Sequence, residues 1–63
     1  MTQFERNAAE TAVALGVSME TAIAMEIAFL QTMTKLAVDN NIGDADVHAK
    51  NREMLDAAAA KIR

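Results

Sequence analysis

Three side chains of this sequence are of the types that carry acid–base chemistry together: His48, Glu26 and Glu53. A histidine oriented by a carboxylate acts as a general base when a nucleophile or a substrate pocket lies beside it. The chain offers no cysteine or tyrosine as a nucleophile, and its one serine, Ser18, stands where a helix cap is expected. We therefore predict that the protein is not an enzyme and that His48 is a structural or surface residue.

Residue types and spacing also disfavour metal and cofactor sites. With one histidine and no cysteine, a Cys-ligated or multi-His zinc site is excluded within one chain. Di-iron bundles require a Glu three residues before a His, and no Glu stands three residues before His48. Gly16 and Gly43 are isolated, unlike the glycines of a phosphate-binding loop. The sequence therefore predicts no metal and no cofactor.

The elements that would position any site are few, because the chain has 63 residues. We interpret residues 1–63 as one helical domain. Hydrophobic residues make up 52%, but fourteen of them are alanine, which favours helix and fills little core volume. Such a core contributes only ~3–5 kcal/mol, and no disulfide can supplement it. A second copy of the chain or a larger partner is the remaining source of stability.

Charge bears on partners and on location. The net charge of −3, with six Lys and Arg residues, disfavours general affinity for polyanions. Gln3, Glu5 and Arg6 stand where a signal peptide would be apolar. Glu26 interrupts the longest apolar stretch, short of the ~20 residues that span a bilayer. We expect a cytoplasmic protein that does not bind membrane, and nucleic acid is the less favoured partner.

Capping signals predict three helices, at about residues 2–15, 18–39 and 44–62. Thr2 and Glu5 fit a capping box at the start of the first helix, and Gly16 suits the left-handed position that ends it. Ser18 is a good N-cap for the second helix, the stretch DNNIGD ends it, and Asp44 caps the third. A short second loop favours antiparallel neighbours. The expected fold class is all-α, a long antiparallel helical hairpin with a shorter N-terminal helix folded across it.

The second helix is apolar around an arc of roughly 200°, about twice the width that one neighbouring helix covers. The third helix has a narrow apolar stripe, so we expect apolar surface to be left over after the chain has folded. Such a surface usually marks an interface, and a symmetric homodimer is the commonest solution. We predict a homodimeric helical bundle. The residues expected at its interface are Ile23, Glu26, Ile27, Leu30, Met33 and Asn51.

Two polar residues interrupt these apolar stripes. Glu26 lies near the middle of the arc, where an unpaired carboxylate is costly to bury. It either meets solvent at a seam or makes an interface contact that sets specificity, and catalysis ranks last. Asn51 either meets solvent or, buried, fixes register and oligomeric state. Two interpretations, core filling or a groove for a partner helix, stay open for the methionines: Met19, Met25, Met33 and Met54.

The corner between the first two helices, ETAVALGVS at Glu10–Ser18, resembles the helix-turn-helix pattern of many bacterial regulators. Ala12 stands four residues before Gly16, Val17 follows the glycine, and Ser18 begins the next helix. The same LGVS, followed by ETAIA, is also similar to ubiquitin-associated domains, whose first turn carries such a Gly–apolar pair. The helix-turn-helix resemblance implies that the second helix reads DNA.

The would-be recognition helix lacks the side chains that read bases. It offers no Arg or Lys before Lys35, whereas base edges are read by Arg, Lys, Asn and Gln. The residues it presents instead are Glu20, Thr21, Ala24 and Glu26. We therefore interpret the stretch as a plain helical corner. Four basic residues remain on the third helix, interspersed with acidic ones as on a solvated face: Lys50, Arg52, Lys61 and Arg63.

The sequence thus favours a non-enzymatic helical protein that self-associates and binds or inhibits a larger protein partner. The alternative is a small nucleic-acid-binding regulator of transcription or RNA. It would use the degenerate helix-turn-helix-like corner, or a patch in which Arg52 and Arg63 are doubled across a two-fold axis.

Overall fold

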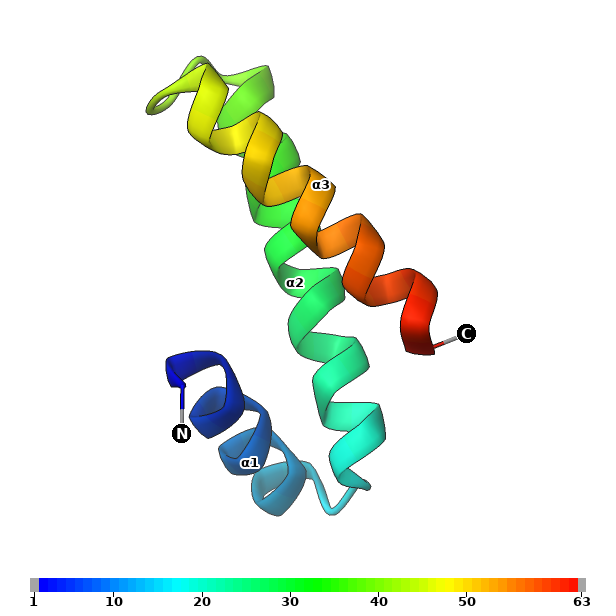
Figure 1. Cartoon of the computed structure of the whole chain (residues 1–63). Helices are drawn as coiled ribbons and strands as arrows, with labels where there is room; N and C mark the ends of the chain where they lie inside the picture. Colours follow the sequence, from blue (N-terminus) through cyan, green and yellow to red (C-terminus); the bar gives the residue numbers. More distant parts are fainter. Residues whose placement is uncertain (1, 63) are drawn as a thin grey trace.

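The computed structural model describes residues 2–62 and consists of three helices joined by two short connections (Figure 1). The helices are α1 (Gln3–Leu15), α2 (Met19–Asp39) and α3 (Ala45–Ile62), and no strand occurs in the described range. Helix α2 is central: α1 and α3 each pack on it, and between residues 2 and 62 they do not pack on each other. The predicted all-α class and the long hairpin with a shorter first helix are confirmed.

Local capping chemistry sets where α1 begins. The Thr2 hydroxyl accepts a hydrogen bond from the backbone N–H of Glu5 at 3.1 Å, and the Glu5 carboxylate accepts one from the N–H of Thr2 at 3.2 Å. This reciprocal pair is the predicted capping box. Thr2 itself has extended backbone, with φ −74° and ψ 162°, so the helix begins one residue later than the sequence predicts.

The corner between α1 and α2 also forms as its residue types predict. Gly16 adopts the left-handed conformation with φ 66° and ψ 36°, and the N–H of Val17 donates to the carbonyl of Ala12 at 3.1 Å. This is the hydrogen bond of a glycine-ended Schellman cap. The Ser18 hydroxyl then accepts from the N–H of Thr21 at 3.1 Å and caps α2. The chain therefore reverses within three residues and α1 folds back beside α2 (Figure 1).

The end of α2 uses asparagine where the first corner uses glycine. Asn41 has φ 55°, a left-handed value that asparagine tolerates better than most residues. The N–H of Ile42 donates to the carbonyl of Ala37 at 2.8 Å, and that of Asn41 donates to Val38 at 3.2 Å. These are the two hydrogen bonds of a full Schellman motif, and they direct the chain back along α2 as α3.

The core is small because alanine supplies much of it. In the described residues, the fully covered positions are Ala8 of α1 and Ala22 of α2, both 0% exposed, and Ile27 of α2, 3% exposed. The radius of gyration is 12.6 Å, whereas a compact chain of this length has one of about 10.6 Å. The three helices are therefore splayed, and one chain does not close over its own apolar surface.

Candidate interaction surface

His48 lies in the first turn of α3 and lines a hollow together with Glu53 and Asp56. Between residues 2 and 62, its ring makes no hydrogen bond to either carboxylate. Its ring nitrogen Nε2 is hydrogen-bonded to the backbone carbonyl of Ile42. The antiparallel hairpin explains why Glu26 is out of reach. His48 is the fourth residue of α3 and lies beside the end of α2. Glu26 lies thirteen residues before Asp39, the last residue of α2, which is roughly 20 Å along the helix axis. His48 therefore closes the loop over the end of α2 in this structure.

Glu26 lies on the α1 side of α2, half-buried. It lines a shallow hollow between the two helices that also contains Asn7, Glu10 and Thr11 of α1 and the aromatic ring of Phe29. Two carboxylates and two small polar side chains therefore share this hollow. Among residues 2–62, no cluster of three His, Cys, Asp or Glu side chains is placed to hold a metal ion.

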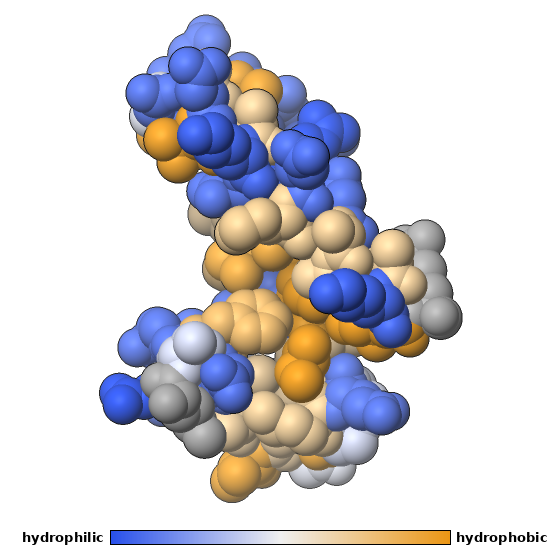
Figure 2. Space-filling model, in the orientation of Figure 1, coloured by the Kyte–Doolittle hydropathy of each residue, from blue (hydrophilic) through white to orange (hydrophobic). Residues whose placement is uncertain are grey.

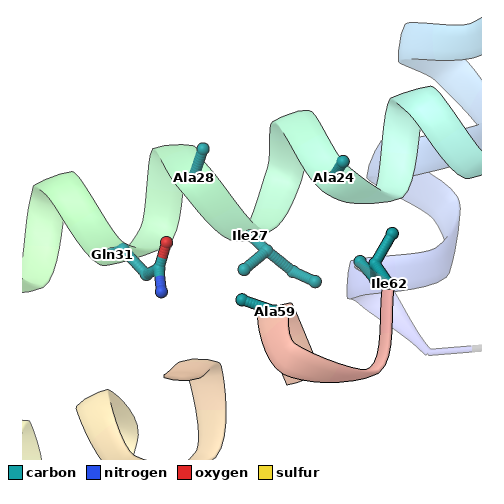
Figure 3. Close-up of a pocket in the computed structure, with 6 residues that line it drawn as sticks. All are labelled: Ala24, Ile27, Ala28, Gln31, Ala59 and Ile62. Atoms are coloured by element: carbon teal, nitrogen blue, oxygen red, sulfur yellow. The ribbon is translucent and has the colours of Figure 1, made fainter. Parts of the chain in front are cut away.

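Three of the predicted interface residues lie on the α3 side of α2. Ile27 is almost completely covered, and Figure 3 shows it pointing from α2 toward Ala59 and Ile62 of α3. Ile23 and Leu30 are half-buried, four residues before and three after Ile27 and hence on the same face. Ile27 therefore has little surface left to offer a second chain, and the interface roles of Ile23 and Leu30 stay predictions.

The opposite flank of the apolar arc is only partly covered, with α1 beside it. Met33, one of the predicted interface residues, is 50% exposed, and so is Phe29. Met25 is 42% exposed and Leu36 is 49% exposed. These four side chains recur at intervals of four, four and three residues, so they form one stripe along α2. We call this set, Met25, Phe29, Met33 and Leu36, the apolar stripe.

Apolar side chains of α3 widen the exposed surface of the hairpin. Met54 is 67% exposed and Val47, seven residues earlier on the same face, is 52% exposed. Figure 2 shows apolar side chains gathered across the middle of the molecule, with hydrophilic residues concentrated toward the end that carries the α2–α3 loop. Asn51 is half-buried on α3, and its predicted role in setting register stays a prediction.

A polar side of the hairpin contrasts with the apolar stripe. The side-chain amide of Gln31 on α2 donates a 2.9 Å hydrogen bond to the carboxylate of Asp56 on α3. A hollow beside this bond is also lined by Thr32, Lys35 and Arg52. Three charged residues, Lys35, Arg52 and Asp56, therefore lie together on this side of the hairpin. Arg63, part of the basic set noted in the sequence, lies outside the described residues.

Helix α2 contains an apolar window that meets the length and composition of a membrane-crossing helix. Glu26 therefore does not exclude a membrane span by length and composition, and the expected cytoplasmic location without membrane binding stays a prediction. A single such helix indicates a membrane span only weakly. Only 11% of the window is buried within the chain, so α2 is not hidden as the core helix of a large protein is.

No protein-family model, curated protein sequence or solved structure matches the chain.

The apolar stripe is the feature that sequence reasoning did not single out. Met25, Phe29 and Leu36 belong to the apolar side of the second helix, but the residues predicted for the interface came mainly from its other flank. The available signal was the spacing of large side chains, since the stripe carries an aromatic ring and two thioethers and no charge. Tertiary packing determines which flank of the arc α3 covers, and therefore which flank stays exposed.

Proposed function

We propose that the protein is a non-enzymatic helical interaction protein that self-associates and, as an assembly, binds or inhibits a larger protein. The observation that carries this proposal is apolar surface that the chain leaves open. Twelve large apolar side chains among residues 2–62 are each at least 40% exposed. Four of them form the apolar stripe along α2, and contiguous exposed apolar patches mark interaction sites.

The total accessible surface supports the same proposal. The chain exposes 4852 Å², whereas a folded monomer of 6.8 kDa is expected to expose about 4,000 Å². The surplus is roughly 850 Å², and a standard protein interface covers about 800 Å² on each partner. One further protein surface of ordinary size therefore accounts for the surplus.

The arrangement of polar groups favours binding over catalysis. The ring of His48 is engaged by the carbonyl of Ile42, and Ser18 is occupied as a helix cap. At the helix-turn-helix-like corner, the exposed first turns of α2 present Glu20 and Thr21, with no basic side chain. A nucleic-acid interface needs Lys and Arg against phosphates, so an interaction with protein is the better-supported function.

Sedimentation equilibrium from about 1 to 100 μM tests self-association. We expect the average mass to rise toward that of an oligomer, and the midpoint of urea unfolding to rise with protein concentration, as it must when folding is coupled to association. A folded monomer throughout this range would contradict the proposal.

A nucleic-acid titration tests the alternative. A labelled DNA duplex and an RNA hairpin are titrated at about 50 mM salt, where electrostatic affinity is strong. We expect no binding at protein concentrations that give full self-association. Salt-sensitive binding to either probe would favour the regulator of transcription or RNA instead.

A further inference from the structure

We propose that a second copy of the chain packs antiparallel on α2 through the apolar stripe, with a two-fold axis beside Phe29. This inference rests on the self-association proposed above and adds its surface, orientation and register. The occupant is a second copy because the stripe is self-complementary, because the surplus area matches one protomer's share of a dimer interface, and because the pairing covers the end of α2 that a single chain leaves bare.

The stripe is arranged symmetrically about Phe29. Phe29 is the midpoint of α2, with ten residues on each side between Met19 and Asp39. Met25 lies four residues before it and Met33 four residues after it. A two-fold axis beside Phe29 pairs antiparallel positions whose numbers add to 58, so Met25 of one copy lies against Met33 of the other. The two Phe29 rings meet at the axis, and a flexible thioether lies on either side of them.

The length of α1 favours the antiparallel orientation. Helix α1 has 13 residues and α2 has 21, about 20 Å against about 31 Å. Helix α1 therefore covers only the part of α2 next to their corner, where Ala22 is 0% exposed and Leu36 at the far end is 49% exposed. The two-fold axis brings Leu36 to the level of Ala22 of the second copy, whose side chain is already completely covered, so Leu36 lies against the α1 helix of that copy. The α1 helix of each copy is thereby brought onto the bare end of the other.

A parallel pair leaves that bare end open. In-register parallel α2 helices also place Phe29 on Phe29, but both α1 helices then lie at the same end. Leu36 and the neighbouring turns of both copies keep their exposed surface. The antiparallel pair covers more apolar area with the same helices, and burial of apolar area is the main driving force for association.

Charge does not oppose the antiparallel contact. The apolar stripe contains no ionisable side chain, and the carboxylate nearest to it on α2 is Glu26, on its flank. In the antiparallel register the two Glu26 positions are offset by six residues along the axis, roughly 9 Å. That separation is about one Debye length at physiological ionic strength, so their repulsion is largely screened where they reach solvent.

Single-cysteine cross-linking tests this register, because the natural chain has no cysteine and each variant carries one thiol. Phe29→Cys is compared with Ala28→Cys, an exposed neighbour at almost the same level along α2 but 100° further round. The second arm mixes Met25→Cys and Met33→Cys in equal amounts and leaves Phe29 in place. All samples are oxidised above the association midpoint, and the disulfide-linked products are resolved by mass.

We expect Phe29→Cys to link to itself at least ten times faster than Ala28→Cys. In the mixture we expect the Met25→Cys–Met33→Cys product to exceed both self-linked products together several-fold. A disulfide requires Cα atoms about 4.4–6.8 Å apart, so this product reports direct opposition of the two positions.

The outcomes separate this inference from the function on which it rests. If the wild type self-associates but Met25→Cys and Met33→Cys each link to themselves, the pair is parallel and the inference is wrong, while the interaction function stands. Linking of Ala28→Cys in preference to Phe29→Cys overturns the proposed surface in the same way. If the wild type is a monomer that instead floats with phosphatidylcholine vesicles, a lipid surface is the occupant of the stripe, and both proposals fail.

Discussion

The side-chain amide of Gln31 on α2 donates a 2.9 Å hydrogen bond to the carboxylate of Asp56 on α3. It is the one side-chain hydrogen bond between two helices in the described part of the chain; the others join residues at most six positions apart. It lies next to the contact of Ile27 with α3, and Figure 3 shows Gln31 and Ile27 directed to the same helix. The hairpin is therefore held by the apolar contact of Ile27 with α3 and by the Gln31–Asp56 hydrogen bond.

Removing the Gln31–Asp56 hydrogen bond is expected to destabilise the hairpin modestly. Gln31→Ala should lower the free energy of unfolding by about 0.5–1.5 kcal/mol, the net value of a typical side-chain hydrogen bond. Urea unfolding at one fixed protein concentration measures it, with Asp56→Ala and the double variant completing a cycle. Gln31 is half-buried and Asp56 is exposed, so a coupling energy near zero would mean that solvent replaces the bond without loss.

Two glycines with left-handed backbone are expected to respond differently to a methyl group. Gly16 has φ 66° and a Cβ there would meet nothing within 4 Å, whereas a Cβ on Gly43, φ 78°, would lie 2.9 Å from Nε2 of His48. Both Gly→Ala changes incur the left-handed penalty of about 1–2 kcal/mol. Gly43→Ala must also displace the imidazole from the Ile42 carbonyl, which adds about 1 kcal/mol.

Thermal unfolding of the two variants at matched concentration measures this difference. His48→Ala in the Gly43→Ala background is the control, because it removes the ring that the new methyl group meets. We expect His48→Ala to be nearly neutral in the Gly43→Ala background, although it is destabilising in the natural sequence. Equal losses for Gly16→Ala and Gly43→Ala would show that the loop relaxes around the methyl group.

A charge within the apolar stripe is expected to dissociate the assembly without unfolding the helices of each chain. Met33→Asp places a carboxylate where the side chain is 50% exposed in the single chain and covered in the proposed dimer. Central interface positions cost about 2 kcal/mol or more when disrupted, so the dissociation constant should rise at least about 30-fold.

Sedimentation velocity across a dilution series, with circular dichroism for helix content, makes this measurement. Lys35→Glu is the matched control, because Lys35 is exposed on the polar side of the hairpin, where it lines the hollow with Arg52 and Asp56. It should shift the dissociation constant by no more than a few-fold. A stronger effect from Lys35→Glu than from Met33→Asp would place the interface on the polar side.

Features set by local chemistry were predictable from the sequence. The caps at Thr2 and Ser18 and the left-handed Gly16 each depend on residues within a few positions of one another, and all three formed as predicted. Each predicted helix began one residue early, because a cap residue stands outside the helix that it caps. Helix class, number and order follow from these signals together with the periodicity of apolar residues.

Features set by tertiary packing were less accessible. In an apolar arc of about 200°, the sequence does not distinguish the flank that a neighbouring helix covers from the flank that stays exposed. In the structure, α3 covers the flank that contains Ile27. That choice depends on the path of the loop through Asn41 and Gly43, both in left-handed conformations. The position of His48 was missed for a related reason. Carboxylate partners can be recognised in a sequence, but its acceptor is a backbone carbonyl.

The apolar surface of α2 leads to a last prediction, which concerns lipid. Helix α2 is long enough to span a bilayer, but Glu26 lies three residues from its midpoint at Phe29, and Lys35 lies six residues beyond that midpoint. A charged side chain near the centre of a bilayer costs roughly 2.5–3.5 kcal/mol, while a second copy covers the apolar stripe and leaves both charges in reach of water. We therefore expect the wild type to stay in the aqueous fraction when floated with phosphatidylcholine vesicles.

Glu26→Leu, which removes the charge nearest the midpoint, should shift a larger fraction of the protein into the vesicle layer, whereas the size-matched Glu26→Gln should shift less. Quantitative flotation of the wild type at low micromolar concentration would show that the apolar stripe is covered by lipid and not by protein.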